Sequence, residues 1–280
     1  MDNNRESAQG LWRYVRRYLT VYLPRIRGLS PKTVESYRQS IAMYCVFLKE
    51  TARIAFTNIS FELVTRASVM EFVQSLRSSA RSASTCNLRL SSLKSFLKYC
   101  GDEDVGLTSV YSEVRRIPLM KGTRRPVGHL SEAAVKALLA QPDHKTVKGM
   151  RNRLMLILLY DTGVRVQELV DLRVSDLQLR AKNPFIIVTG KGSKTRSVPL
   201  MDKTVSHLKE YLKRFHTEGE AARPLFYSVR SGELHKLSTD AVAVILRTYG
   251  NIARKTCAEV PERVHPHLFR HYSASRTITE

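Results

Sequence analysis

The sequence predicts a mainly α-helical protein of two domains, with a small β-hairpin or sheet in the second. Three observations predict this fold class. Apolar residues recur at helical spacing over most of the chain, whereas in the stretch 183–200 two strand-like segments flank a turn that contains glycines. A length of 280 residues also exceeds the usual span of one compact core, so two cores are expected.

The first half predicts an all-helical bundle over residues 1–105. In "SPKTVESYRQSIAMYCVFLKE", Ser30 suits an N-cap and Pro31 suits the first helical turn. "RASVMEFVQSLRS" and "STCNLRLSSLKSFLKYC" repeat the amphipathic pattern. The apolar stripe of the first of these helices comprises Val34, Tyr37, Ile41, Tyr44, Cys45 and Leu48.

Residues 106–127 predict a basic and mostly non-helical linker, because helical periodicity fades while prolines and basic residues accumulate. Such a connector suits a protein that closes around a DNA duplex, although an ordinary exposed linker explains it equally. The residues concerned are Arg115, Arg116, Pro118, Lys121, Arg124, Arg125 and Pro126.

The second domain, residues 128–280, predicts helices around one hairpin. "HLSEAAVKALLAQPD" has an N-cap at Ser131 and ends at Pro142, and "LMLILLY" lies in an apolar helix. A Thr-Gly turn leads into the helix of "VRVQELVDL". "NPFIIVTGKGSKTRSVPL" then predicts a hairpin with lysines at its tip. Helices around 205–215 and 238–253 precede the closing segment "HPHLFRHYSASRTITE".

The charge balance points to nucleic acid. There are 46 basic and 25 acidic residues, a net charge of +21. Up to Arg125 there are 21 basic and 10 acidic residues (+11), which leaves 25 and 15 (+10) after it. Two basic halves could contact a duplex from two sides and release its counterions. A membrane-surface or ribosome-associated protein is the alternative.

The cysteines indicate a reducing, cytoplasmic setting. Cys45, Cys86, Cys100 and Cys257 form no CxxC pair and show no zinc-ligand spacing. The N-terminal stretch has no apolar signal-peptide core, and the run 154–160 is too short to cross a bilayer. We expect no metal, no other cofactor and no membrane partner.

Three places hold polar residues that packing does not explain. Arg165 and Glu168 share a helix face, Lys191 stands between two glycines at the hairpin tip, and His267, Arg270 and His271 share a face of the closing helix. Each has an ordinary explanation: an ion pair, a solvated lysine and a structural histidine. The helix start beside His267 would add an anion site.

Taken together, the order Arg, Lys and His-x-x-Arg resembles the catalytic domain of tyrosine recombinases, the phage integrases and Xer-type enzymes. "TGVRVQELVDLRVSDL" is similar to the first arginine box, "VTGKGSKTRSVPL" to the lysine hairpin, and "HPHLFRH" to the second box. "LSPKTVESYRQSI" and "STCNLRLSSLKSFLKY" resemble the family's helical, SAM-like core-binding domain. The resemblance runs over nearly the whole chain.

The resemblance implies a metal-independent transesterification. Arg165 and Arg270 would hold the non-bridging oxygens of the scissile phosphate as its charge grows. Lys191 would protonate the departing 5′ oxygen, and His267 would act as an acid–base partner or phosphate donor. Glu168 would support this site. A homo-tetramer on paired DNA sites is implied for the full-length protein.

Further contacts with double-stranded DNA are expected from basic residues of both domains and the linker. They are Arg89, Lys94, Arg124, Arg125, Lys194 and Arg196.

The nucleophile is the missing part. In the family, an "LGH"-like stretch and then the nucleophilic tyrosine follow the second box by some tens of residues. This chain ends at Glu280, and Tyr272 is too close to Arg270 to take that place. We therefore expect a C-terminally truncated chain, by nature, frameshift or artificial boundary, that binds DNA without forming a covalent adduct. A tyrosine supplied by a partner chain is the alternative.

Three functions remain in competition. A site-specific recombinase or integrase is preferred, and a non-catalytic DNA-binding remnant that occupies recombination sites is the second. A type IB topoisomerase is disfavoured by the helical first domain and the small size. The recognised site, the mobile element or host, and the choice among integration, excision and resolution stay open.

Overall fold

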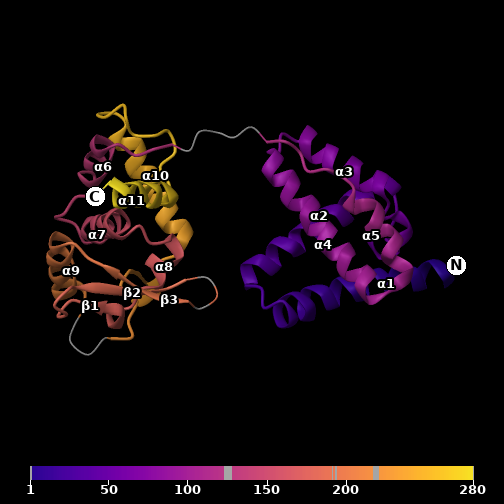
Figure 1. Ribbon diagram of the computed structural model, residues 1–280, viewed down its shortest axis with the longest axis horizontal. Helices are drawn as coiled ribbons and strands as arrows, with labels where there is room; N and C mark the ends of the chain where they lie inside the picture. Colours follow the sequence, from indigo (N-terminus) through magenta and orange to yellow (C-terminus); the bar gives the residue numbers. More distant parts are fainter. Residues whose placement is uncertain (1, 123–127, 191, 193, 217–220, 280) are drawn as a thin grey trace. The chain divides into compact units, whose positions relative to one another are not determined.

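The computed structural model divides the chain into two compact units, Met1–Arg125 and Pro126–Glu280, each with its own apolar core (Figure 1). The structure describes residues 2–122, 128–190, 192, 194–216 and 221–279, and the side chains of 10–273 within these ranges. It is mainly helical with small antiparallel sheets, which confirms the predicted fold class.

The first unit is all helical. Short polar side chains cap the helices α2, α3 and α4. As predicted, Ser30 caps α2, and its Oγ accepts from the backbone N–H of Thr33 at 3.3 Å. The elements are α1 (Asp2–Arg17), the π-helix η1 (Tyr18–Ile26), α2 (Pro31–Ala52), η2 (Phe56–Asn58), η3 (Phe61–Leu63), α3 (Arg66–Ser78), α4 (Ala83–Glu103), η4 (Val105–Leu107) and α5 (Thr108–Arg115).

The core of this unit forms where α2, α3 and α4 pack together with the first helices. The predicted stripe of α2 is buried, except that Tyr37 is half-buried. From η1, the buried Tyr18 donates its hydroxyl hydrogen bond to Ser95 Oγ on α4 at 2.9 Å. Two helices far apart in sequence are thereby joined.

The prediction of a mostly non-helical linker over residues 106–127 is wrong in part, because residues 108–115 form helix α5. Val114 and Ile117 are buried in the core of the first unit, so this segment packs on α4 instead of connecting two domains. A helix of eight residues shows little periodicity, which explains the error. Residues 123–127 of the predicted linker, including Arg124 and Arg125, lie outside the described residues.

The second unit surrounds one apolar helix. Helix α7 contacts α6, α8, α9 and α11, and Figure 1 shows α11 running beside it. The helices are α6 (Glu132–Leu139), α7 (Val147–Thr162), α8 (Val166–Asp171), η5 (Val174–Asp176), α9 (Asp202–Phe215), α10 (Thr239–Ala253) and α11 (Pro266–Thr279). The strands are β1 (Leu177–Gln178), β2 (Phe185–Thr189), β3 (Thr195–Pro199), β4 (Tyr227–Arg230) and β5 (Glu233–Lys236).

The predicted hairpin is the centre of a three-stranded antiparallel sheet in the order β1-β2-β3. Ile186 and Val188 of β2 are buried in the core and lie opposite Val198 and Arg196 of β3. Because side chains alternate along a strand, Arg196 shares its face of β3 with the half-buried Val198. The hairpin β4–β5 forms a second, separate sheet that the sequence did not predict.

Within the described residues, no helix combines the length and the apolar composition required to cross a membrane.

Lys94 stabilises the end of α5. Its Nζ donates to the backbone carbonyls of Arg115, at 3.0 Å, and Ile117. Replacing it (Lys94→Met) should lower the unfolding free energy of the first unit by about 1–3 kcal/mol, because helix-end carbonyls lose a charged donor. Urea unfolding followed by fluorescence of Trp12, the single tryptophan, which stacks on Phe56 in this unit, measures this.

The matched control is Lys98→Met on the same helix. Lys98 pairs with Asp102 at 2.7 Å, but both side chains are more than half exposed. Its loss should therefore change stability by less than about 1 kcal/mol. Equal losses in the two variants would contradict the role assigned to Lys94.

Candidate catalytic site

The turn between α7 and α8 positions Arg165. Helix α7 ends at Gly163, which has a left-handed backbone with φ of 56°, and its N–H donates to the carbonyl of Leu159 at 3.2 Å. Glycine adopts this conformation without the strain that a Cβ brings. Arg165 then has extended geometry at the N-cap position of α8, without a side-chain cap hydrogen bond. The Thr-Gly turn predicted from the sequence thus places Arg165 in the short connection between α7 and α8.

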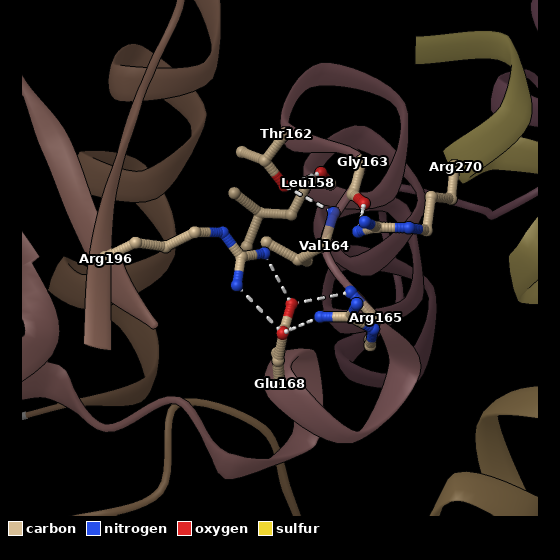
Figure 2. Close-up of polar contacts among 8 residues, drawn as sticks. All are labelled: Leu158, Thr162, Gly163, Val164, Arg165, Glu168, Arg196 and Arg270. Atoms are coloured by element: carbon tan, nitrogen blue, oxygen red, sulfur yellow. Dashed lines mark hydrogen bonds and ion pairs between the residues drawn. The ribbon is translucent and has the colours of Figure 1, made fainter. Parts of the chain in front are cut away.

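A buried carboxylate, Glu168 on α8, joins this turn to the hairpin (Figure 2). Its Oε1 accepts from Arg165 Nη1 at 2.9 Å and from Arg196 Nη1 at 2.9 Å. Its Oε2 accepts from the Arg165 backbone N–H at 2.9 Å and from Arg196 Nη2 at 2.8 Å. The predicted contact between Arg165 and Glu168 is confirmed, and Arg196 is a second partner that the sequence analysis missed.

The pKa of Glu168 follows from these contacts. Burial alone would raise it, since the Glu168 side chain is 2% exposed. The hydrogen bonds from Arg196 and from the backbone and side chain of Arg165 outweigh burial and lower the pKa to about 2. Glu168 is therefore ionised at neutral pH. One carboxylate between two guanidiniums leaves the cluster with a single positive charge.

The base of the hairpin lies directly against this carboxylate. Gly190, the residue after β2, packs closely on Glu168, because a Cβ there would lie 3.0 Å from Glu168 Oε1. Its N–H donates to the Lys194 carbonyl at 2.8 Å and closes the hairpin. Lys191, the predicted general acid, lies outside the described residues.

Arg270 reaches the same turn from α11. Its Nη1 donates to the carbonyl of Gly163 at 2.8 Å, and Figure 2 shows it extending toward the turn that carries Arg165. Leu268 and Phe269, 2% and 0% exposed, anchor α11 in the core. The predicted helix and the predicted burial of these two side chains are confirmed. Two arginines more than a hundred residues apart thus meet at one turn.

The histidines of this segment lie at the surface. His267 is exposed, with its ring centroid 6.2 Å from that of the exposed His265. Partial burial and, after it, electrostatic repulsion from the His267 and His271 rings lower the pKa of His265. His271 is also exposed and follows Arg270 on α11. Arg270 gives this face one fixed positive charge.

The remaining residues predicted to bind DNA are in different situations. Arg89 lies between α4 and α2, where its Nη1 donates to the Ser36 carbonyl at 3.2 Å and to Ser40 Oγ at 3.0 Å. Lys94 donates to α5, as described above, and Lys194 is exposed. Contact of these residues with DNA stays a prediction.

Comparison with known protein families identifies the class of this protein, the tyrosine recombinases. Residues 129–280 match the model described as "Phage integrase family", and residues 15–104 match "Phage integrase, N-terminal SAM-like domain". The chain belongs to the phage integrase family, the tyrosine recombinases. The resemblance inferred from the sequence motifs is confirmed.

Individual relatives agree with this. A putative integrase/recombinase of Sinorhizobium fredii is 28% identical over 95% of this chain and 93% of its own length. A tyrosine recombinase of Pseudothermotoga lettingae is 31% identical over 92% and 82%. A crystal structure of a lambda integrase dimer bound to a COC′ core site covers 95% of this chain and 88% of its own, with a TM-score of 0.67 and 18% identity. That last likeness concerns the fold.

Acid should weaken the site through Glu168. Because the pKa of Glu168 is lowered to about 2, its contribution to stability is complete above the ordinary glutamate pKa, about 4.3, and is lost as the pH falls toward 2. The loss should be on the order of 3 kcal/mol. Hydrogen exchange at residues 185–199, corrected for intrinsic rates, should accelerate between pH 5 and 2.5 in the unaltered chain and much less in Glu168→Gln.

The control for this experiment is Glu132→Gln on α6, an exposed acid paired with Lys136. That variant should keep the full acid response of the hairpin. An identical response in all three proteins would show that Glu168 does not link the hairpin to α8.

Gly163 should tolerate no side chain. A Cβ there would lie 2.8 Å from Ser273 Oγ on α11 and would also require a strained positive φ. Gly163→Ala should therefore displace α11, and hydrogen exchange at residues 266–273 should accelerate. Gly192→Ala is the control, because Gly192 has a φ of 75° but no atom within 4 Å of its Cβ position. If both variants left α11 equally protected, the close packing would be unnecessary.

Proposed function

We propose that this protein is a site-specific DNA recombinase or integrase that cuts and rejoins DNA by metal-independent transesterification. The convergence of Arg165 and Arg270 on the α7–α8 turn is the observation that carries the proposal. One nitrogen of each guanidinium donates to an oxygen of the protein: Arg165 Nη1 to Glu168 and Arg270 Nη1 to the Gly163 carbonyl. The other guanidinium N–H groups make no hydrogen bond to the described residues.

Those remaining donors suit a phosphodiester. A guanidinium has five N–H donors in a planar fork, which matches two non-bridging phosphate oxygens. Attack on the phosphorus by a tyrosine hydroxyl, the family's nucleophile, to which we assign no residue of this chain, forms one P–O bond while the bond to the 5′ oxygen breaks. Negative charge grows on the non-bridging oxygens during this step, so two arginines held in place stabilise the transition state more than the ground state. Arg165 and Arg270 would supply this stabilisation. Lys191 would protonate the 5′ oxygen, and His267 would assist as an acid–base partner or a phosphate donor.

The substrate in this proposal is double-stranded DNA. The net charge of +21, present in both halves, supports it, and so does the likeness to a lambda integrase dimer bound to its core site. The proposal includes the division into a DNA-binding domain and a catalytic domain, and a homo-tetramer on paired sites. It also includes a cytoplasmic location, which cysteine usage suggests and where a DNA substrate would be met.

Binding to duplex DNA tests the proposal. The dissociation constant should rise by about 10³-fold or more between 50 and 200 mM salt, as expected for a protein that contacts six or more phosphates. Arg165→Gln and Arg270→Gln should keep most of the affinity, because each removes one of many phosphate contacts. In ethylation interference, however, ethylation of one particular phosphate should weaken binding of the unaltered chain and should no longer weaken binding of each variant.

Lys148→Gln is the matched control. Lys148 is an exposed cation near the start of α7, at the end of that helix opposite Gly163. It should leave that phosphate unaffected. An affinity that does not respond to salt, or an interference pattern that Lys148→Gln changes in the same way, would overturn the proposal. A covalent adduct on a nicked duplex would separate an active recombinase from a protein that only occupies the DNA.

A further inference from the structure

We propose that Arg196 is a positioning residue, which neutralises Glu168 so that Arg165 keeps its charge and its free donors for the scissile phosphate. The inference rests on the proposed function, since it assumes that Arg165 contacts a phosphate. It also gives Arg196 a role different from the direct DNA contact that its place in a basic hairpin suggests.

The two arginines bind Glu168 with different numbers of side-chain hydrogen bonds. Arg196 offers two nitrogens, Nη1 and Nη2, one to each oxygen of Glu168, at 2.9 and 2.8 Å. Arg165 offers one side-chain nitrogen and its backbone N–H. Each carboxylate oxygen therefore accepts two hydrogen bonds. Arg196 makes the two-point pair, whereas Nη2 and Nε of Arg165 have no hydrogen bond to the residues that the structure describes and can bind another ligand.

The charges lead to the same conclusion. Glu168 is 2% exposed, so water cannot compensate its charge. With Arg196 present, two guanidiniums face one carboxylate and a single positive charge remains. Without Arg196, Arg165 alone would neutralise Glu168. It would also be drawn into a two-point pair with the carboxylate, and the phosphate would meet a neutral site.

The position of Arg196 fits this role. It lies on β3 beside Val198 on the core-facing side of the strand, with its side chain 40% exposed. It reaches Glu168 from the hairpin, and Figure 2 shows it on the side of the carboxylate opposite Arg165. At the base of the hairpin, Gly190 fits against the same carboxylate. Arg196 therefore also fixes the hairpin, and with it the strand ends that flank Lys191, to the α7–α8 turn.

A double-mutant cycle on the whole chain distinguishes positioning from direct contact. Arg196→Gln should remove the interference signal of the phosphate that depends on Arg165, as Arg165→Gln does. Adding Glu168→Gln to Arg196→Gln should restore it, with an affinity within about twofold of the Glu168→Gln single variant. If Arg196 itself held a phosphate, the second substitution would not restore its signal, and the proposal would fail.

Glu168→Gln removes one negative charge in any background, so the general gain in DNA affinity that follows must be subtracted. Arg180→Gln is the matched control, because Arg180 is an exposed arginine in the turn between β1 and β2 of the same sheet. The gain from Glu168→Gln should be larger beside Arg196→Gln than beside Arg180→Gln. Equal gains would mean that net charge alone is responsible and would overturn the proposal.

A measurement without DNA tests the positioning directly. The ¹⁵N–¹H signal of Arg165 Nε should shift in Arg196→Gln, as the guanidinium turns toward Glu168, and should return toward its original position in the double variant. An unchanged signal would overturn the proposal even if DNA binding were lost. If Arg196→Gln does not fold, Arg196→Lys allows the same comparison, since lysine keeps the charge and loses the two-point geometry.

The two proposals fail in different ways. If the unaltered chain shows no phosphate that depends on Arg165, the proposed function is wrong, whereas the Arg165 signal still decides whether Arg196 positions that side chain. If the phosphate is found and the double variant does not recover it, the proposed function stands and the role of Arg196 is rejected.

Discussion

One buried carboxylate holds the candidate site together. In a chain with a net charge of +21, Glu168 is enclosed by the turn before α8, by strand β3 and by the backbone at Gly190. A buried charge is tolerated only when hydrogen bonds and opposite charges surround it, and Glu168 has four donors. The position of the hairpin relative to Arg165 depends on this requirement.

Gly163 fixes the other half of the site through its backbone. Its left-handed conformation ends α7 and turns the chain toward Arg165, and its lack of a side chain admits Ser273 of α11. Its carbonyl then accepts from Arg270. One glycine thus sets the direction of one arginine and the anchor of the other. This explains how residues separated by more than a hundred positions reach the same place.

The features that could be predicted from the sequence are those set by residues close together in the chain. The cap at Ser30, the stripe of α2 and the hairpin of residues 185–199 follow from short-range patterns. Helix α5 and the β4–β5 hairpin were missed, because both are short and are held by packing that periodicity does not record. The sequence analysis assigned Arg196 to DNA contact and did not predict its pairing with Glu168, because Glu168 lies 28 residues away in the chain. Alternation along β3, which puts Arg196 beside Val198, was the one available signal.

The two arginines are anchored by different kinds of oxygen, and this difference matters for a phosphate ligand. The carbonyl of Gly163 is neutral, so it orients Arg270 without reducing its charge. Glu168 is an anion that would cancel Arg165 if it stood alone, and a second guanidinium is needed beside it. Donors oriented before the ligand arrives require little reorganisation as negative charge develops. The pairing of Glu168 with two arginines is therefore the way in which this site combines rigid anchoring with a positive charge that remains available.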